Sequence, residues 1–340
     1  MDNIGLDLHK RESQLCILTS DGEVVERRIQ TSRERFTAVL GERAPARILV
    51  EAATESEWVA QHLEALGHEV IVADPNFAPM YATRSRRVKT DRRDARTLAE
   101  ACQLAAYRRV HRLSPARRHV QVELTVRDAL IRTRTRYVAV VKARVRREGL
   151  RVPGGDLEHT VAKLMALPLS VAVAAELAPL VALLEPLNAQ IVAADARLAA
   201  LAAADAVVQR LMTAPTIGPV TAVAYVATLD DVGRFATARR VAAYLGLAPT
   251  ERSSGEQQRR GPISKTGNPR VRCLLVEAGW RILRSTQPAA APLRAWAERI
   301  AARRGRAIAA VALARRLAGI LYAMWRDDVD YRAAAISAVV

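Results

Sequence analysis

The sequence predicts an α/β domain with a mixed sheet, followed by a helical arm and a mostly helical C-terminal domain. Three short strands meander at the N-terminus, helices and strands then alternate, and the pattern from Asp91 onward is helical. The 340 residues fit two or three domains, and a hydrophobic content of 50% supplies a core for each. We expect these domains at residues 1–110, 111–208 and 209–332.

The expected sheet consists of short strands joined by turns and helices. Strands are predicted at residues 3–9, 13–19, 23–29, 46–51 and 69–73, and helices at residues 31–41 and 56–66. The runs ARILVE and EVIVA contain continuous apolar stretches at residues 48–50 and 70–73, so the last two strands should be buried. A meander followed by alternating helices and strands predicts a mixed sheet with helices packed against it.

The second half of the chain is expected to be helical. Ser114 and Pro115 form a helix start, a capping residue followed by proline, and that helix can run to about Gly149. Residues 156–210 are rich in Ala and Leu and predict the helices of an arm or bundle, with coiling around a partner chain as one interpretation. The last helical domain should contain a polar loop at residues 251–269.

The positive charge is concentrated in two blocks. Residues 84–147 carry a net charge of +15 and residues 251–340 carry +10, whereas residues 1–83 carry −6 and residues 148–250 carry −2. The simpler explanation of these basic blocks is that they are solvated helix faces in an Arg-rich chain. The neighbouring segments of the same chain are net acidic, however, so the concentrated positive charge favours nucleic-acid binding. The predicted contact residues are Arg84, Arg86, Arg87, Lys89, Arg132, Arg134, Arg136, Lys142, Arg259, Arg260, Lys265 and Arg270.

Cysteine usage and apolar runs exclude several classes of protein. Three isolated cysteines exclude a disulfide scaffold and a cysteine-based zinc site, and they fit the reducing cytoplasm. The N-terminal residues do not form a signal peptide. The longest uncharged run, residues 211–229, contains two prolines and a glycine, so we interpret it as core rather than as a membrane span.

Four carboxylates occur in an order that is typical of a metal site. Asp7 lies within an apolar strand, and Glu51 ends a buried strand. Asp91 and Asp94 are spaced i,i+3 and share one face of a helix start. Converging carboxylates repel one another unless a divalent cation neutralises them, and oxygen ligands suit Mg²⁺ or Mn²⁺. Two such ions can serve phosphodiester chemistry. The ordinary alternatives to a metal site are that Asp7 is simply solvated on its strand and that Asp91 and Asp94 belong to a capped helix start.

The same residues carry a family resemblance. GLDLHK at residues 5–10, Glu51 at a strand end and KTDRRDA at residues 89–95 resemble the DEDD transposases of the IS-one-ten insertion-sequence family. The resemblance implies a RuvC-like catalytic domain of the RNase H type. It also implies that Asp7, Glu51, Asp91 and Asp94 are the catalytic, metal-binding tetrad, with Glu55 and Asp74 as lower-ranked neighbours.

A second resemblance lies near the C-terminus. YLGLAPTERSSG at residues 244–255, followed by RRGPISKTGNPRVR, resembles the C-terminal transposase domain of the same family. A lone SSG is also common in flexible loops. The resemblance implies that Ser254, which directly precedes the glycine, is a catalytic nucleophile, with Ser253 as the second choice; arginines nearby would stabilise the transition state.

Together the resemblances imply a cytoplasmic, nucleoid-associated bacterial transposase that cuts and rejoins donor and target DNA. They further imply a structured guide (bridge) RNA and a homo-oligomer, a dimer or a tetramer, without a membrane. Two other functions remain open from the residues alone. One is a metal-dependent endonuclease that uses water, like a Holliday-junction resolvase, and the other is a nucleic-acid-binding protein without catalysis.

Overall fold

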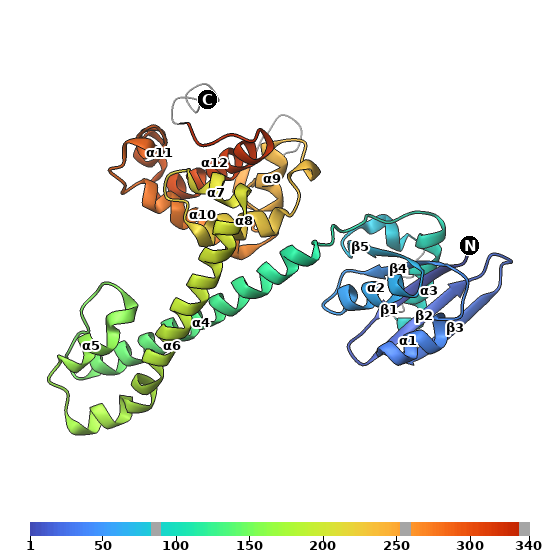
Figure 1. Cartoon of the computed structure of the whole chain (residues 1–340), viewed down its shortest axis with the longest axis horizontal. Coiled ribbons are helices and arrows are strands. Elements are labelled where there is room, and N and C mark those ends of the chain that lie inside the picture. The colour runs from blue at the N-terminus through green and yellow to red at the C-terminus, as the bar shows by residue number, and fades with distance from the viewer. Residues whose placement is uncertain (83–89, 252–259, 333–340) are drawn as a thin grey trace. The chain divides into compact units, whose positions relative to one another are not determined.

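The computed structural model describes residues 1–82, 90–251 and 260–332 of the chain. Residues 83–89, 252–259 and 333–340 lie outside this description. The chain forms two compact units, Met1–Arg112 and Leu113–Val340, each described by itself (Figure 1). The first unit contains the sheet, and the second is mostly helical, so the predicted mixed α/β and helical parts are confirmed.

A five-stranded mixed sheet forms the first unit. Its strands are β1 (Asn3–Leu8), β2 (Glu12–Leu18), β3 (Val24–Gln30), β4 (Arg47–Glu51) and β5 (Glu69–Ala73). The order across the sheet is β3-β2-β1-β4-β5. β2 runs antiparallel to β1 and to β3, whereas β4 runs parallel to β1 and to β5. Each strand begins and ends within one residue of the predicted position.

Helices cover both faces of this sheet. On one face, Ile4, Leu6 and their neighbours pack against α1 (Arg33–Leu40) and α2 (Ser56–Ala65). The helix α3 (Asp91–Gln103) packs on the other face, where Leu98 and Cys102 meet Leu49 and Ile71. Successive strand residues therefore enter two different cores, because side chains alternate across a strand. A short helical turn, η1 (Ala78–Tyr81), follows β5.

The second unit contains nine α-helices and a small hairpin among its described residues. The α-helices are α4 (Pro115–Arg147), α5 (Thr160–Met165), α6 (Val171–Ala204), α7 (Ala206–Met212), α8 (Pro219–Leu229), α9 (Ala238–Tyr244), α10 (Pro269–Ile282), α11 (Ala291–Arg304) and α12 (Arg306–Arg326). The single-turn helices are η2 (Leu157–His159), η3 (Val232–Arg234) and η4 (Pro288–Ala290). The hairpin consists of β6 (Pro249–Glu251) and β7 (Arg260–Ile263), which pair antiparallel.

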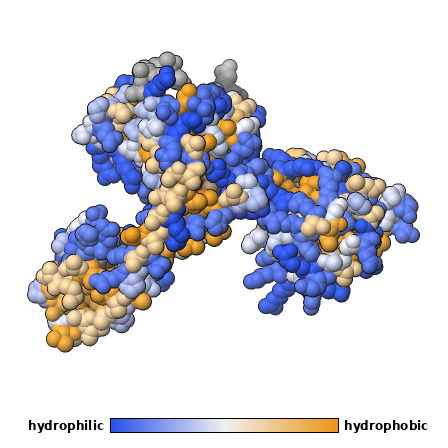
Figure 2. All heavy atoms as spheres, viewed as in Figure 1, coloured by the Kyte–Doolittle hydropathy of each residue, from blue (hydrophilic) through white to orange (hydrophobic). Residues whose placement is uncertain are grey.

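Two long helices, α4 and α6, pack against each other (Figure 1). The hydroxyl of Ser114 accepts a hydrogen bond from the backbone N–H of Arg117, so this residue caps α4 as predicted. α6 continues through Pro179 and Pro186, although each proline lacks the N–H that the helix would use. Several large apolar side chains of these helices are exposed, and Figure 2 shows apolar residues on the visible surface of this part of the unit.

The core of the second unit is built around α8 and α12. Every residue from Thr221 to Leu229 is buried, as expected for the longest uncharged run. Two buried tyrosines tie the core together: the hydroxyl of Tyr225 donates to the carbonyl of Ala318 at 2.7 Å, and that of Tyr322 to the carbonyl of Phe235 at 2.6 Å. The polar segment at 251–269 was expected to be a loop, whereas its described ends form part of the hairpin and the start of α10.

Two helices, α6 and α12, have the length and apolar composition that could cross a membrane. This is weak evidence, because core helices of soluble proteins pass the same test. Half of the apolar window of α12 is buried inside the unit. Its hydrophobicity is therefore explained by the core that it shares with α8 and α10.

Candidate active site

The two strand carboxylates lie on the α3 face of the sheet, at neighbouring strand ends. Residues two apart on a strand point to the same face of the sheet. Asp7 therefore shares a face with Gly5, which lies against α3. Glu51 shares a face with Leu49, which packs with Leu98 and Cys102 of α3. β1 and β4 are adjacent and parallel, with Gly5 paired to Leu49. The carboxyl ends of parallel strands meet at one edge of a sheet, so both side chains lie at that edge.

α3 begins at the same edge. The hydroxyl of Thr90 accepts a hydrogen bond from the N–H of Arg93, which fixes the first turn, and Asp91 and Asp94 lie in that turn. One turn further along, Ala95 is packed directly over Gly5. The helix axis is therefore held close to β1, and its first-turn carboxylates are directed toward the strand ends.

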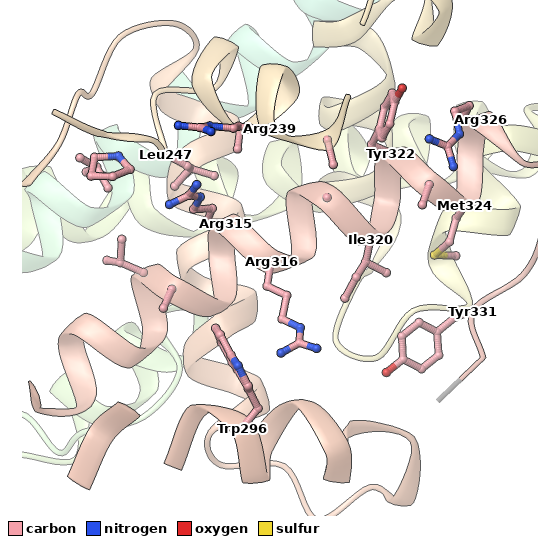
Figure 3. Close-up of a pocket in the computed structure, with 18 of the residues that line it drawn as sticks. Arg239, Leu247, Trp296, Arg315, Arg316, Ile320, Tyr322, Met324, Arg326 and Tyr331 are labelled. Carbon is pink, nitrogen blue, oxygen red and sulfur yellow. The ribbon is translucent and has the colours of Figure 1, made fainter. Parts of the chain in front are cut away.

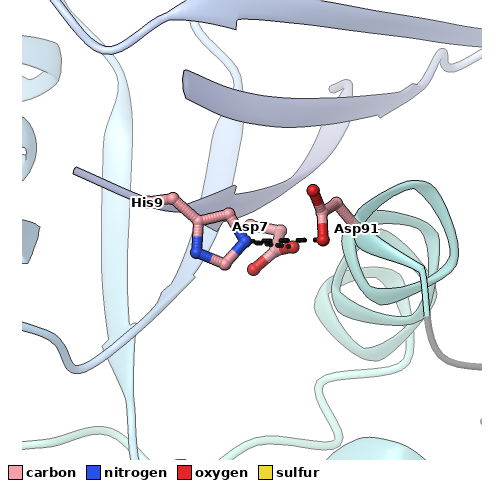
Figure 4. A group of neighbouring side chains, drawn as sticks. All are labelled: Asp7, His9 and Asp91. Atoms are coloured by element: carbon pink, nitrogen blue, oxygen red, sulfur yellow. Dashed lines mark ion pairs between the residues drawn. The ribbon is translucent and has the colours of Figure 1, made fainter. Parts of the chain in front are cut away.

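Asp7, His9 and Asp91 form a compact group (Figure 4). One potential ligand atom from each residue lies within 4.8 Å of those of the others. His9 Nε2 lies 3.3 Å from Asp7 Oδ2 and 3.6 Å from Asp91 Oδ1. His9 was not predicted as a site residue, although its place two residues after Asp7 in GLDLHK was a usable signal, since such residues share a face in an extended chain.

The pKa of Asp7 is influenced by the charges of the three other predicted carboxylates. Burial raises the pKa of Asp7 to about 6, His9 opposes this, and the charges of Asp94, Asp91 and Glu51 raise it further. Its side chain is 14% exposed, and its buried Oδ2 atom has His9 Nε2 at 3.3 Å but forms no well-aligned hydrogen bond with the described residues. A buried carboxylate oxygen with only this one weakly aligned contact is poorly satisfied, and a cation or a proton would satisfy it better.

Glu51 is held by a neighbouring tyrosine. The hydroxyl of Tyr81 donates to Glu51 Oε1 at 2.6 Å. The lower-ranked carboxylates have other bonds: Glu55 accepts a hydrogen bond from the indole of Trp58 at 2.6 Å, and Asp74 accepts one from the backbone N–H of Asn76 at 2.9 Å. Tyr81 was not anticipated from the sequence, because nothing in its spacing points to Glu51.

This donor set fits a divalent cation. The group offers carboxylate oxygens from Asp7 at a strand end and from Asp91 at a helix start, together with the imidazole of His9. Glu51 and Asp94 are not part of this compact group, although their charges act on Asp7. Hard cations such as Mg²⁺ and Mn²⁺ prefer such ligands. Burial and then repulsion by the other carboxylates raise the pKa of Asp7, and a bound cation would offset that repulsion.

The predicted nucleophile lies outside the described residues. Ser254, Ser253 and Arg259 belong to the segment 252–259, which connects β6 to β7. The base of this hairpin is described and is tightly held. Arg272 Nη1 donates to the carbonyls of Leu245 at 3.1 Å and Thr266 at 2.8 Å.

The predicted nucleic-acid contacts differ in how they are held. Arg84, Arg86, Arg87 and Lys89 lie outside the described residues, and of Arg260 only the backbone is described. Arg136 and Lys265 are exposed, Lys142 is half-buried, and Arg132 is exposed at 3.3 Å from Asp128. Arg134 and Arg270 are engaged inside the unit, with Arg134 donating to Asn188 and Arg270 pairing with Asp128 at 3.1 Å.

Comparisons with known proteins agree over both halves of the chain. A profile described as "Transposase IS116/IS110/IS902 family" matches residues 208–294, and a profile of DEDD transposases described as "Transposase" matches residues 4–147. A "Probable family 20 transposase" of Pseudomonas aeruginosa is 32% identical, covering 98% of this chain and 99% of the relative. The chain belongs to the IS110 family of transposases.

Other relatives also match over nearly the whole chain. The transposase for insertion sequence element IS1111A of Coxiella burnetii is 27% identical, over 98% of this chain and 92% of the relative. The transposase for insertion sequence element IS1328 of Yersinia enterocolitica is 28% identical, over 94% and 95%. This transposase is an enzyme that cleaves and rejoins DNA, so the predicted activity and the DNA substrate are confirmed. DEDD transposase domains generally depend on divalent metal ions, which agrees with the carboxylate group.

Proposed function

We propose that this transposase joins DNA strands through a serine nucleophile and a carboxylate metal site in a RuvC-like domain of the RNase H type. The tetrad of Asp7, Glu51, Asp91 and Asp94 would hold Mg²⁺ or Mn²⁺, and His9 lies in the same group. The observation that carries this proposal is the buried Oδ2 of Asp7, which lies 3.3 Å from His9 Nε2 without a well-formed hydrogen bond and is exposed to the charges of Asp94, Asp91 and Glu51. The strand order β3-β2-β1-β4-β5 supports the fold assignment.

Each residue would have a defined task. A bound divalent cation would supply Lewis-acid polarisation of the scissile phosphate. Tyr81 holds one oxygen of Glu51 and thereby orients the carboxylate. Ser254 Oγ would lose its proton and form a bond to phosphorus. The bond from phosphorus to a deoxyribose oxygen would break, and that leaving oxygen would take up the proton. The resulting phosphoserine link retains the phosphodiester energy for rejoining, whereas water would not.

The partners are part of the proposal. We infer that a structured guide RNA selects donor and target DNA, that the basic segment 84–147 contacts phosphate backbones, and that the enzyme acts as a homo-oligomer in the cytoplasm at the nucleoid. The support is the net charge of +15 on residues 84–147, together with the exposed Arg132 and Arg136 on α4. Residues 111–208 would form the arm for nucleic-acid binding and oligomerisation, and residues 209–332 the domain that carries the serine segment.

Metal titration tests the carboxylate site without depending on activity. Calorimetry of the full chain with Mn²⁺ should show binding that Asp7→Asn and Asp94→Asn each weaken at least tenfold. Glu55→Gln is the matched control, because Glu55 is bonded to Trp58 instead. Equal Mn²⁺ affinity in all three variants would exclude the tetrad as the metal site.

A trapped-product assay tests the serine step. Wild-type protein incubated with donor DNA and Mg²⁺ should yield DNA bonded to protein through a serine phosphoester. Ser254→Ala should lose this adduct while keeping Mn²⁺ binding, and Ser253→Ala should keep both. Loss of the adduct only in Ser253→Ala would identify Ser253, and not Ser254, as the nucleophile. Products with free ends and no adduct would instead support a nuclease that uses water.

A further inference from the structure

A large groove in the second unit shares no lining residue with the carboxylate group of the first unit. It has a volume of about 1600 Å³ and is lined by α9, the hairpin, α11, α12 and the residues that follow α12 (Figure 3). Small-molecule pockets are typically about 300–1,000 Å³. A groove of this size and openness therefore suits a stretch of polymer better than a single small molecule.

The floor of the groove is apolar and partly aromatic. Leu247, Ile308 and Ile320 line it together with Trp296 and Tyr331. Ile308 is 43% exposed, so its side chain is accessible from the groove. Trp296 and Tyr331 are partly exposed, and together with the aliphatic side chains they offer an apolar surface against which the flat rings of a ligand can pack; Arg316 covers part of the Trp296 ring.

The edges of the groove are strongly basic. Six arginines line it, whereas the only acidic lining residues among those described are Asp327 and Asp330. These arginines are Arg239, Arg304, Arg315, Arg316, Arg326 and Arg332. Asp327 is already bonded to Arg326, at 2.6 and 2.7 Å. The groove therefore carries an excess of positive charge that a polyanion would neutralise.

Two of these arginines are available to a ligand. Arg239 and Arg315 are exposed and make no hydrogen bond or ion pair with the residues that the structure describes. Arg316 lies over the ring of Trp296, with 4.6 Å between its guanidinium carbon and the ring centroid (Figure 3). Burial lowers the pKa of Arg316, and the charge of Arg299 lowers it further.

We propose that this groove binds an unpaired stretch of nucleic acid, with bases on the apolar floor around Trp296 and phosphates on Arg239 and Arg315. Duplex DNA keeps its bases stacked inside and presents only phosphates and groove edges, so it would leave the apolar floor unused. Unpaired strands expose base faces and phosphates together, which matches an aromatic floor with basic edges. This inference rests on the DNA-processing activity of the family and not on the proposed serine chemistry.

Binding of short strands to the full-length protein tests the groove. The probes are fluorescent dT12, rU12, an abasic 12-mer and a 12-base-pair duplex. The double variant Arg239→Gln/Arg315→Gln should weaken dT12 or rU12 binding about tenfold and reduce the log–log salt slope by about 1.4, the value for two contacts to a single strand. The two unpaired probes distinguish DNA from RNA as the preferred strand.

A matched variant separates the groove from general charge effects. Arg281→Gln/Arg303→Gln removes the same charge from exposed arginines of the same unit that do not line the groove. It should change dT12 affinity less than twofold, and the abasic strand should bind wild-type protein about tenfold more weakly than dT12. An equal loss in both double variants, or equal binding of abasic strand and dT12, would overturn the proposal.

Tryptophan fluorescence reports on the floor directly. Adding dT12 or rU12 should quench the emission of wild-type protein, and Trp296→Phe should remove that part of the quench while keeping most of the affinity. Asp7→Asn should keep the quench even where strand transfer is lost. Failure of the metal-site proposal can therefore be distinguished from failure of the groove proposal. If the quench appeared only after residues 333–340 were removed, the chain's own end would be the occupant and the proposal would be wrong.

Discussion

Gly5 of β1 lies against the backbone of Ala95 in α3. A Cβ atom placed on Gly5 would lie 2.0 Å from the carbonyl oxygen of Ala95 and 2.3 Å from the backbone nitrogen of Ala99. Such distances leave no room for a side chain, so the absence of one at Gly5 determines how closely α3 approaches the sheet. The same helix carries Asp91 and Asp94 in its first turn, and so the glycine sets their distance from Asp7.

Gly5→Ala should therefore affect both stability and chemistry. The added methyl group meets backbone atoms, which cannot rotate away, so we expect a loss of about 1–3 kcal/mol in the free energy of unfolding. Strand transfer should fall further than the folded fraction does, because α3 shifts with its carboxylates. Urea denaturation and an assay at saturating Mg²⁺ measure the two effects. Gly154→Ala, which meets nothing within 4 Å, is the control and should leave both unchanged.

Tyr81→Phe should loosen the metal site without disturbing the fold. It removes the hydroxyl that bonds Glu51 at 2.6 Å and keeps the ring. Loss of a residue that orients a metal ligand typically costs about 10–100-fold in affinity or activity, so the Mn²⁺ concentration at half-maximal activity should rise about tenfold. An unchanged Mn²⁺ dependence would show that Glu51 is positioned by other means.

Arg136 and Arg270 should respond differently to the same substitution. Arg136 is exposed on α4 and makes no hydrogen bond or ion pair with described residues, so Arg136→Gln should reduce the salt slope of nucleic-acid binding by about 0.7–0.9 at unchanged stability. Arg270 pairs with Asp128 and donates to Thr125 at 3.1 Å. Arg270→Gln should instead cost about 1–2 kcal/mol in stability. Salt titrations of nucleic-acid binding and thermal unfolding compare the two variants. A large change in salt slope for Arg270→Gln and none for Arg136→Gln would show that Arg270, and not Arg136, contacts the nucleic acid.

Acid should remove the stability that Asp205 contributes. Burial alone would raise the pKa of Asp205, but hydrogen bonds from Arg117 and from the N–H of Val208 outweigh it, and the pKa lies below its usual value. A carboxyl with a depressed pKa in the folded state stabilises the protein above the unfolded-state pKa of about 4. This contribution disappears as the pH falls through the depressed pKa.

Asp205→Asn measures that contribution. Asparagine can still cap α7, so the variant should lose mainly the charge interaction with Arg117, which lies 2.8 Å away. We expect the free energy of unfolding to be about 1 kcal/mol lower than in the wild type at pH 7. The difference should shrink below about pH 4 as the wild-type carboxylate is protonated. A difference that stays constant from pH 7 to pH 3 would show that the charge is not responsible.

Most of the sheet could be predicted because its signals are local. The runs ARILVE and EVIVA and the turn at residues 20–23 gave strands within one residue of those observed, since apolar patterning is a property of neighbouring residues. The hairpin of β6 and β7 was missed because its strands have three and four residues and little apolar character. Pro179 and Pro186 did not interrupt α6, because packing against α4 stabilises a helix that propensity alone disfavours.

By itself, the sequence determined which residue types were available for the chemistry and in what order: a strand Asp, a strand-end Glu, two helix-start Asp residues and an Arg-rich chain. It also carried the family resemblance, which depends on that order. Only the tertiary structure decided that His9 joins Asp7 and Asp91, that Tyr81 binds Glu51, and that Trp296 and its arginines share one groove. These relationships join residues on different elements, and their distances follow from how the helices pack on the sheet and on one another, which no local pattern encodes.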